Sequence, residues 1–126
     1  MSLVAWFPLN GNLDNKGLSN YTLTNSNATV NDNGKIGKCY SFNGTSSYLS
    51  SNFSYQNFGN NVSIAFWVKV SAFTTDNQLL WGTYQNGPFI DIQNQSIRYY
   101  CWAKNTDGTL GNPNSGTYDF STYINK

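Results

Sequence analysis

The segment VSIAFWVKV, residues 62–70, has the clearest secondary-structure pattern in the chain. Its even-numbered residues are all Val, Ile or Phe, whereas the odd-numbered ones are Ser, Ala, Trp and Lys. A period of two places one set on each face of a β-strand. The segment therefore predicts a strand with one apolar face.

Shorter segments along the rest of the chain also have a strand-like pattern. They are separated by turn-forming groups such as Asp32-Asn33-Gly34 and Asn86-Gly87-Pro88. No window has a helical period, and short strands at this spacing are typical of a sandwich or barrel. We expect an all-β, antiparallel fold in one domain, residues 1–126. The further strand candidates are YTLTN (21–25), KCYSFNG (38–44), SYLSS (47–51), QLLWGTY (78–84), PFIDIQ (88–93) and IRYYCWAK (97–104).

The composition limits the classes of function. Aromatic residues make up 17% of the 126 residues and charged residues only 10%, with a net charge of +1. Without a cluster of Lys or Arg, the chain has no electrostatic surface for nucleic acid or an anionic membrane. We expect neither partner, no membrane-spanning segment and no signal peptide. Cys39 and Cys101 have no metal-ligand spacing, and two free thiols are favoured over a disulfide.

The opening segment LVAWFPLNGNLDNKG, residues 3–17, is apolar on both faces up to Pro8 and then enters a turn. Residues 3–7 therefore predict a strand covered on both sides. The segment resembles the start of the laminin-G-like, concanavalin A-like jelly-roll family. GKIGKCYSFNGTSSYLS (34–50) and NVSIAFWVKV (61–70) are similar to two further motifs of that family, in the same order. The resemblance implies an antiparallel jelly-roll sandwich.

The chain departs from this family in two ways. Asn10 and Asn43 replace the Asp that is common in two family turns, and residues 105–126 are loop-like where the family has closing strands. Truncation, divergence or strands supplied by a partner would each explain this. An incomplete sheet leaves open edges, so we expect a homo-oligomer that completes the sandwich.

Hydrolysis of a glycosidic bond requires two carboxyl groups across the scissile bond. The chain has no Glu, no His and no two Asp residues at alternate positions of a strand. It also lacks a Ser-His or Cys-His pair for nucleophilic catalysis. We therefore expect no enzymatic activity.

The turn after Pro8 is the candidate metal site. Asn12 and Asp14 are hard oxygen ligands of the kind that Ca²⁺ prefers, and the resemblance implies a structural calcium near this turn. Asp14 is the only carboxylate there, however. The favoured alternative is a turn in which Asn and Asp bond to the local backbone. We expect no required cofactor.

Alternation in residues 96–104 places Arg98, Tyr100 and Trp102 on one face of a strand. Aromatic rings beside a cation can stack on a sugar or anchor a protein interface. Trp81 and Tyr84 are expected to extend this patch. The alternative is that the same side chains only pack within the protein.

Together these features predict a non-enzymatic, lectin-like binding or structural module on a phage or other virion surface, as a tail, fibre or decoration component for attachment or assembly. Its ligand would be a glycan or another cell-surface group. The alternative is a carbohydrate-binding or adhesion module of a larger secreted bacterial protein. A third interpretation is a scaffold whose aromatic face packs against identical subunits.

Overall fold

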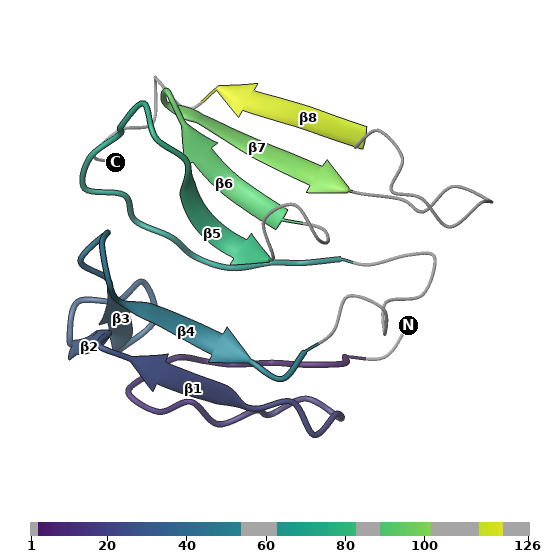
Figure 1. The fold of residues 1–126 in the computed structure, drawn as a ribbon. Coiled ribbons are helices and arrows are strands. Elements are labelled where there is room, and N and C mark those ends of the chain that lie inside the picture. The colour runs from purple at the N-terminus through teal and green to yellow at the C-terminus, as the bar shows by residue number, and fades with distance from the viewer. Residues whose placement is uncertain (1–2, 54–62, 83–88, 102–113, 120–126) are drawn as a thin grey trace. The chain divides into compact units, whose positions relative to one another are not determined.

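The computed structural model describes residues 3–53, 63–82, 89–101 and 114–119, with only the backbone described for Cys101 and residues 114–119. The described residues form antiparallel β-strands and no helix. The chain divides into two compact units, Met1–Trp67 and Val68–Lys126. The predicted all-β, antiparallel character is confirmed (Figure 1).

The first unit contains two two-stranded sheets. Strand β1 (Leu23–Ser26) pairs with β4 (Tyr48–Ser51), and β2 (Thr29–Asn31) pairs with β3 (Cys39–Ser41). Of the predicted strand segments, residues 21–25 overlap β1, and residues 38–44 and 47–51 contain β3 and β4. Ala28 is buried at the short connection from β1 to β2, where the Asn25 side chain bonds to both its N–H and its carbonyl.

The opening segment lies along residues 15–19 without forming a regular strand. Lys16 N donates to Trp6 O over 2.7 Å, whereas Trp6 N donates to the side-chain Oδ1 of Asn15 at 3.0 Å. Because a side chain takes the place of a backbone carbonyl, the ladder is interrupted. Leu3, Val4 and Trp6 are exposed. The expectation of a strand covered on both sides is therefore wrong.

Residues 63–70 also differ from the sequence prediction. The structure assigns no strand to them, and Ile64, Phe66 and Val68 are exposed. Alternating apolar residues favour a pleated surface only where a neighbouring strand provides a partner. Among the residues that the structure describes, none forms a ladder with this segment, so the predicted strand is wrong over residues 63–70. Val62 lies outside the described residues.

The second unit contains one four-stranded antiparallel sheet. Its order is β5 (Gln78–Gly82), β6 (Phe89–Gln93), β7 (Ser96–Cys101) and β8 (Asn114–Asp119). Strands β5, β6 and β7 correspond to predicted segments. Residues 105–126 were expected to form a loop, but they contain β8, which pairs along the whole of β7. That expectation is wrong because backbone pairing with β7 does not require the apolar alternation that β8 lacks.

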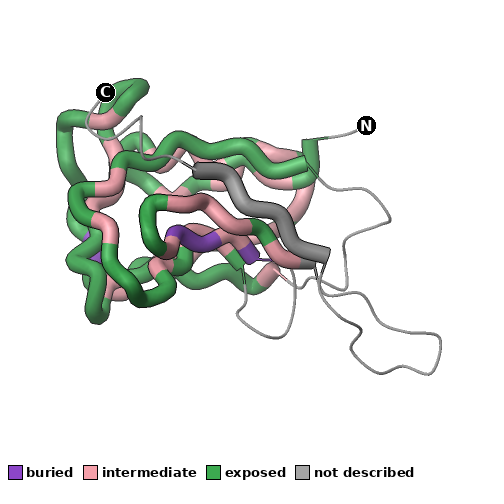
Figure 2. Tube along the Cα trace, turned by 90° about the horizontal axis from the view of Figure 1, so that it is seen from above, coloured by how far each residue is buried: buried purple, intermediate pink, exposed green. Residues whose placement is uncertain are grey.

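Two local features set the register of this sheet. Asn94 and Gln95 form the two-residue turn between β6 and β7, both with positive φ (48° and 65°), as a type I′ turn requires. The register between β5 and β6 shifts between Leu79 and Trp81, which is a β-bulge. Strand β6 contains three of the buried positions, shown in purple in Figure 2.

Candidate functional site

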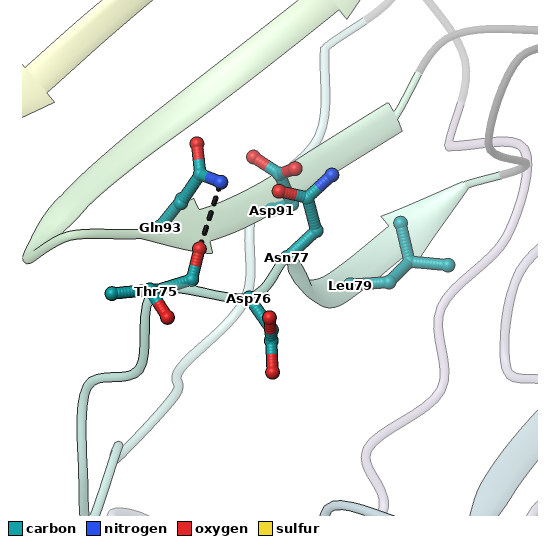
Figure 3. A pocket seen from close by; sticks show the side chains of 6 residues that line it. All are labelled: Thr75, Asp76, Asn77, Leu79, Asp91 and Gln93. Carbon is teal, nitrogen blue, oxygen red and sulfur yellow. Dashed lines mark hydrogen bonds between the residues drawn. The ribbon is translucent and has the colours of Figure 1, made fainter.

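A depression of about 500 Å³ lies at the beginning of β5 and along β6 (Figure 3). In Figure 3 the side chains of Asn77, Asp91 and Gln93 reach toward the same side of β6, whereas Asp76 points the other way. The depression therefore combines amide, hydroxyl and carboxylate groups with one apolar side chain. Its lining residues are Thr75, Asp76, Asn77, Leu79, Asp91 and Gln93.

The segment before β5 forms one wall, and hydrogen bonds to the sheet hold it there. Gln93 Nε2 donates to Thr75 O over 2.9 Å, and Asn94 N donates to Thr74 O over 3.2 Å. Gln78 Nε2 donates to Ala72 O over 3.2 Å at the other end of the segment. Three bonds along six residues fix the path of a chain that has no ladder of its own.

A buried ion pair lies beneath this wall. Asp91 on β6 is directly opposite Arg98 on β7, so the two side chains are on the same face of the sheet. Arg98 Nε donates to Asp91 Oδ1 over 2.9 Å, and Arg98 Nη2 donates to Asp91 Oδ2 over 2.6 Å. The Asp91 side chain is 1% exposed and that of Arg98 is 19% exposed. This is the fork-to-fork geometry in which guanidinium and carboxylate bind most strongly.

The remaining guanidinium donors of Arg98 also contact oxygen atoms. Nη1 donates to Gln93 Oε1, and Nη2 donates to Asn77 Oδ1 over 2.9 Å. The Arg98 Cζ atom is 5.5 Å from the centroid of the Tyr100 ring, which stacks on Phe89 with centroids 4.5 Å apart. The Tyr100 ring covers the guanidinium on one side. Arg98 thus joins β6, β7 and the segment before β5.

This arrangement is suited to binding rather than to acid-base catalysis. Asp91 is the one buried charged residue in the described part of the chain, and both of its oxygen atoms accept hydrogen bonds from Arg98. A carboxylate held in this way is not positioned to take a proton from a substrate. The groups around it can donate and accept hydrogen bonds.

The structure separates the residues that the sequence placed in one patch. Arg98 and Tyr100 share a face with Asp91 and Phe89. Trp81 pairs with Ile90 after the bulge, which places it on the opposite face, so the expected extension of the patch to Trp81 is wrong. Trp102 and Tyr84 lie outside the described residues. Arg98 is mostly buried, in contrast to the exposed contact residue that the alternation predicted.

Sequence reasoning missed the lining residues Thr75, Asn77 and Gln93. Alternation in FIDIQ does place Asp91 and Gln93 on one face, and a two-residue turn at Asn94-Gln95 would have placed Asp91 opposite Arg98. That turn has neither Asn-Gly nor Asp-Gly, the usual sequence signals. No local pattern marks the segment before β5, because two of the bonds that hold it reach residues 18 and 20 positions away.

The candidate metal residues form a hydrogen-bonded turn. Asn12 Oδ1 accepts from Asp14 N over 3.2 Å, and Asp14 Oδ2 contacts Lys16 Nζ at 3.2 Å. The described residues contain no group of three or more His, Cys, Asp or Glu side chains that could hold a metal ion. Asn12 and Asp14 thus take part in the bonds of a turn, the arrangement that was the favoured alternative for these residues. Cys39 carries a free thiol.

Comparison with protein-family models, with curated proteins and with solved structures gives no significant match to this chain. Within the described residues, no helix is long and apolar enough to cross a membrane. The assignment of a function therefore depends on the chemistry of the depression.

Proposed function

We propose that the chain is a non-enzymatic, lectin-like module with a jelly-roll architecture, and that the depression on β5 and β6 is its carbohydrate contact. The observation that carries the proposal is the combination of polar groups with Leu79, which is 50% exposed. A sugar presents hydroxyl groups that both donate and accept, beside patches of C–H. A site that recognises it needs both kinds of partner together with an apolar contact.

Three groups of the lining are free to bond to a ligand, and of these the Asp76 carboxylate points to the other side from Asn77 (Figure 3). In the described part of the chain, the Thr75 hydroxyl, the Asp76 carboxylate and the Asn77 Nδ2 atom have no protein hydrogen-bond partner. The carboxylate accepts, the amide nitrogen donates and the hydroxyl does both. All three residues are exposed, so a ligand reaches them without rearrangement of the sheet.

The absence of Glu and His from the sequence supports a non-enzymatic function. A mechanism that uses carboxyl groups would have to rely on Asp residues, and Asp91 is held by Arg98. Asp76 is exposed and points away from Asp91 in Figure 3. This separation does not provide the pair of opposed carboxyl groups that glycoside hydrolysis uses.

The proposed setting is the surface of a phage or another virion, where the module would mediate attachment or assembly as a homo-oligomer. Its support is the family resemblance of the N-terminal motifs and a surface that is polar but carries little charge. The alternative, a carbohydrate-binding module of a secreted bacterial protein, uses the same depression. Neighbouring genes separate the two: capsid or tail genes favour the virion, and a hydrolase domain in the same reading frame favours the secreted protein.

A glycan array tests the binding activity. The wild-type chain is expected to bind a defined subset of the glycans, and Asn77→Ala is expected not to bind them. Asn33→Ala is the matched control, because Asn33 is an exposed Asn in the first unit whose side chain has no hydrogen bond. Electron microscopy of assembled particles then tests the location. Retention of no glycan, together with no incorporation into particles, would contradict the proposal.

A further inference from the structure

The carboxamide of Asn77 has a defined orientation because of the group that it contacts. A guanidinium carries only N–H donors and no acceptor. Arg98 Nη2 lies 2.9 Å from the Asn77 side chain, so the atom facing Arg98 is the oxygen. Figure 3 shows this oxygen on the side of Asp91 and the nitrogen on the side away from it. The two N–H groups of Asn77 therefore point away from the ion pair.

The side-chain amide of Gln93 is also oriented by the donor or acceptor character of the groups it contacts, at its oxygen and at its nitrogen. Gln93 Oε1 accepts from Arg98 Nη1, and Gln93 Nε2 donates to Thr75 O over 2.9 Å. Turning this amide over would place N–H against N–H at Arg98 and oxygen against oxygen at Thr75. Gln93 therefore holds the backbone of the segment that carries Asn77, while Arg98 holds the side chain of Asn77.

We infer that Arg98 is a positioning residue that fixes the Asn77 amide with its N–H groups toward the ligand, so that the depression selects a ligand with an acceptor oxygen at this point. The part of this inference that concerns the ligand rests on the proposed function. The role of Arg98 rests on the geometry alone. Without Arg98, rotation about the Cβ–Cγ bond of an exposed Asn would exchange donor and acceptor freely. With Arg98, the depression offers a donor at Asn77 in every molecule.

Arginine is required for this role, and lysine is not equivalent. The guanidinium contacts Asp91, Gln93 and Asn77 at the same time, through donors that diverge in a plane. An ammonium group is a single point with three donors and cannot span the same three side chains. Arg98→Lys keeps the charge beside Asp91, but it is expected to release Asn77.

The first measurement uses no ligand. In ¹⁵N-labelled wild-type protein, the Asn77 side-chain NH₂ signals are identified by their loss in Asn77→Asp. Their heteronuclear NOE is expected to match that of the ordered backbone. In Arg98→Lys it is expected to fall to the value of an exposed Asn such as Asn33, whereas a purely structural role would leave it unchanged in the folded variant. An unchanged NOE in Arg98→Lys overturns the positioning role.

The second measurement tests the direction of the hydrogen bond to the ligand. Asn77→Asp keeps an oxygen facing Arg98 but replaces the outward N–H groups with a second acceptor. It is compared with Asn33→Asp, which makes the same charge change in the first unit. The probes are the methyl glycosides of glucose, galactose and mannose, titrated against the side-chain amide signals of the lining residues.

At least one glycoside is expected to shift these signals in the wild type and in Asn33→Asp. Binding to Asn77→Asp is expected to be about tenfold weaker, which corresponds to one lost hydrogen bond of about 1.4 kcal/mol. Equal affinity in Asn77→Asp overturns the inferred donor. If none of the three glycosides has any effect, the proposed sugar binding fails, and the ligand-free NOE still decides the role of Arg98. If Arg98→Lys does not fold, Asn77→Asp decides the donor direction.

Discussion

Replacing Asp91 with alanine is expected to destabilise the protein strongly, because it leaves the charge of Arg98 without its counter-ion. Removing one partner of a buried ion pair costs about 3–5 kcal/mol in other proteins. Arg98 keeps the oxygen atoms of Gln93 and Asn77, and 19% of its side chain is in contact with solvent. The expected loss is therefore near the lower limit, about 3 kcal/mol.

Urea denaturation measures this loss. For an m-value of about 1.5 kcal/mol/M, typical of a small domain, 3 kcal/mol lowers the midpoint by about 2 M. The controls are Arg98→Met and the double variant Asp91→Leu/Arg98→Met. Because the double variant leaves no unpaired charge, its stability is expected to lie within about 1 kcal/mol of the wild type.

The comparison of single and double variants decides whether the reasoning is correct. A loss of less than about 0.7 kcal/mol in Asp91→Ala, a midpoint change under 0.5 M at the same m-value, would show that the pair is well solvated. Additive losses in Asp91→Leu, Arg98→Met and the double variant would show that the two side chains do not interact energetically. Either result would refute the account of the site that places Arg98 at its centre.

Three further outcomes are expected. Phe89→Ala should lower the free energy of unfolding by about 3–5 kcal/mol, measured by urea denaturation, because Phe89 is 4% exposed. Tyr99→Ala, at a site that is 57% exposed, should lower it by under about 1 kcal/mol. Similar losses at both positions would contradict the burial of Phe89. Gly17→Ala should lower the melting temperature because a Cβ there would lie 2.6 Å from Ala5 Cα, and an unchanged melting temperature would show that the opening segment is not held against residues 15–19. Millimolar calcium should leave the melting temperature within about 1 °C, because Asp14 is bonded to its own turn, and a rise of several degrees would establish a calcium site.

Predictions from local pattern succeeded where another strand pairs with the predicted segment. Alternation in FIDIQ and SIRYYC predicted β6 and β7, which a two-residue turn connects. The same reasoning failed for residues 63–70, whose apolar alternation is stronger, and for residues 3–7, which are apolar on both faces. Alternation indicates which face of a strand would be buried, but it does not show whether another strand lies beside it to form the backbone hydrogen bonds. In the opening segment the Asn15 side chain bonds to Trp6 N instead.

The candidate site shows the same division. Alternation in the sequence correctly placed Arg98 and Tyr100 on one face of β7. It did not identify Asp91 as the partner of Arg98, and it placed Trp81 with them. The bulge between Leu79 and Trp81 reverses the face on which Trp81 lies, and a single inserted residue of this kind has no signature in an apolar run such as QLLW.

The all-β class and the absence of Glu and His follow from the sequence alone, because composition and a period of two require no knowledge of the fold. Only the tertiary structure decided that the one Arg of the chain lies beneath Asn77 and Gln93 and opposite Asp91. That arrangement depends on the register of one hairpin and on hydrogen bonds between residues that are 18 to 21 positions apart. Such contacts form only when the strands have paired, so no local pattern in the sequence contains them.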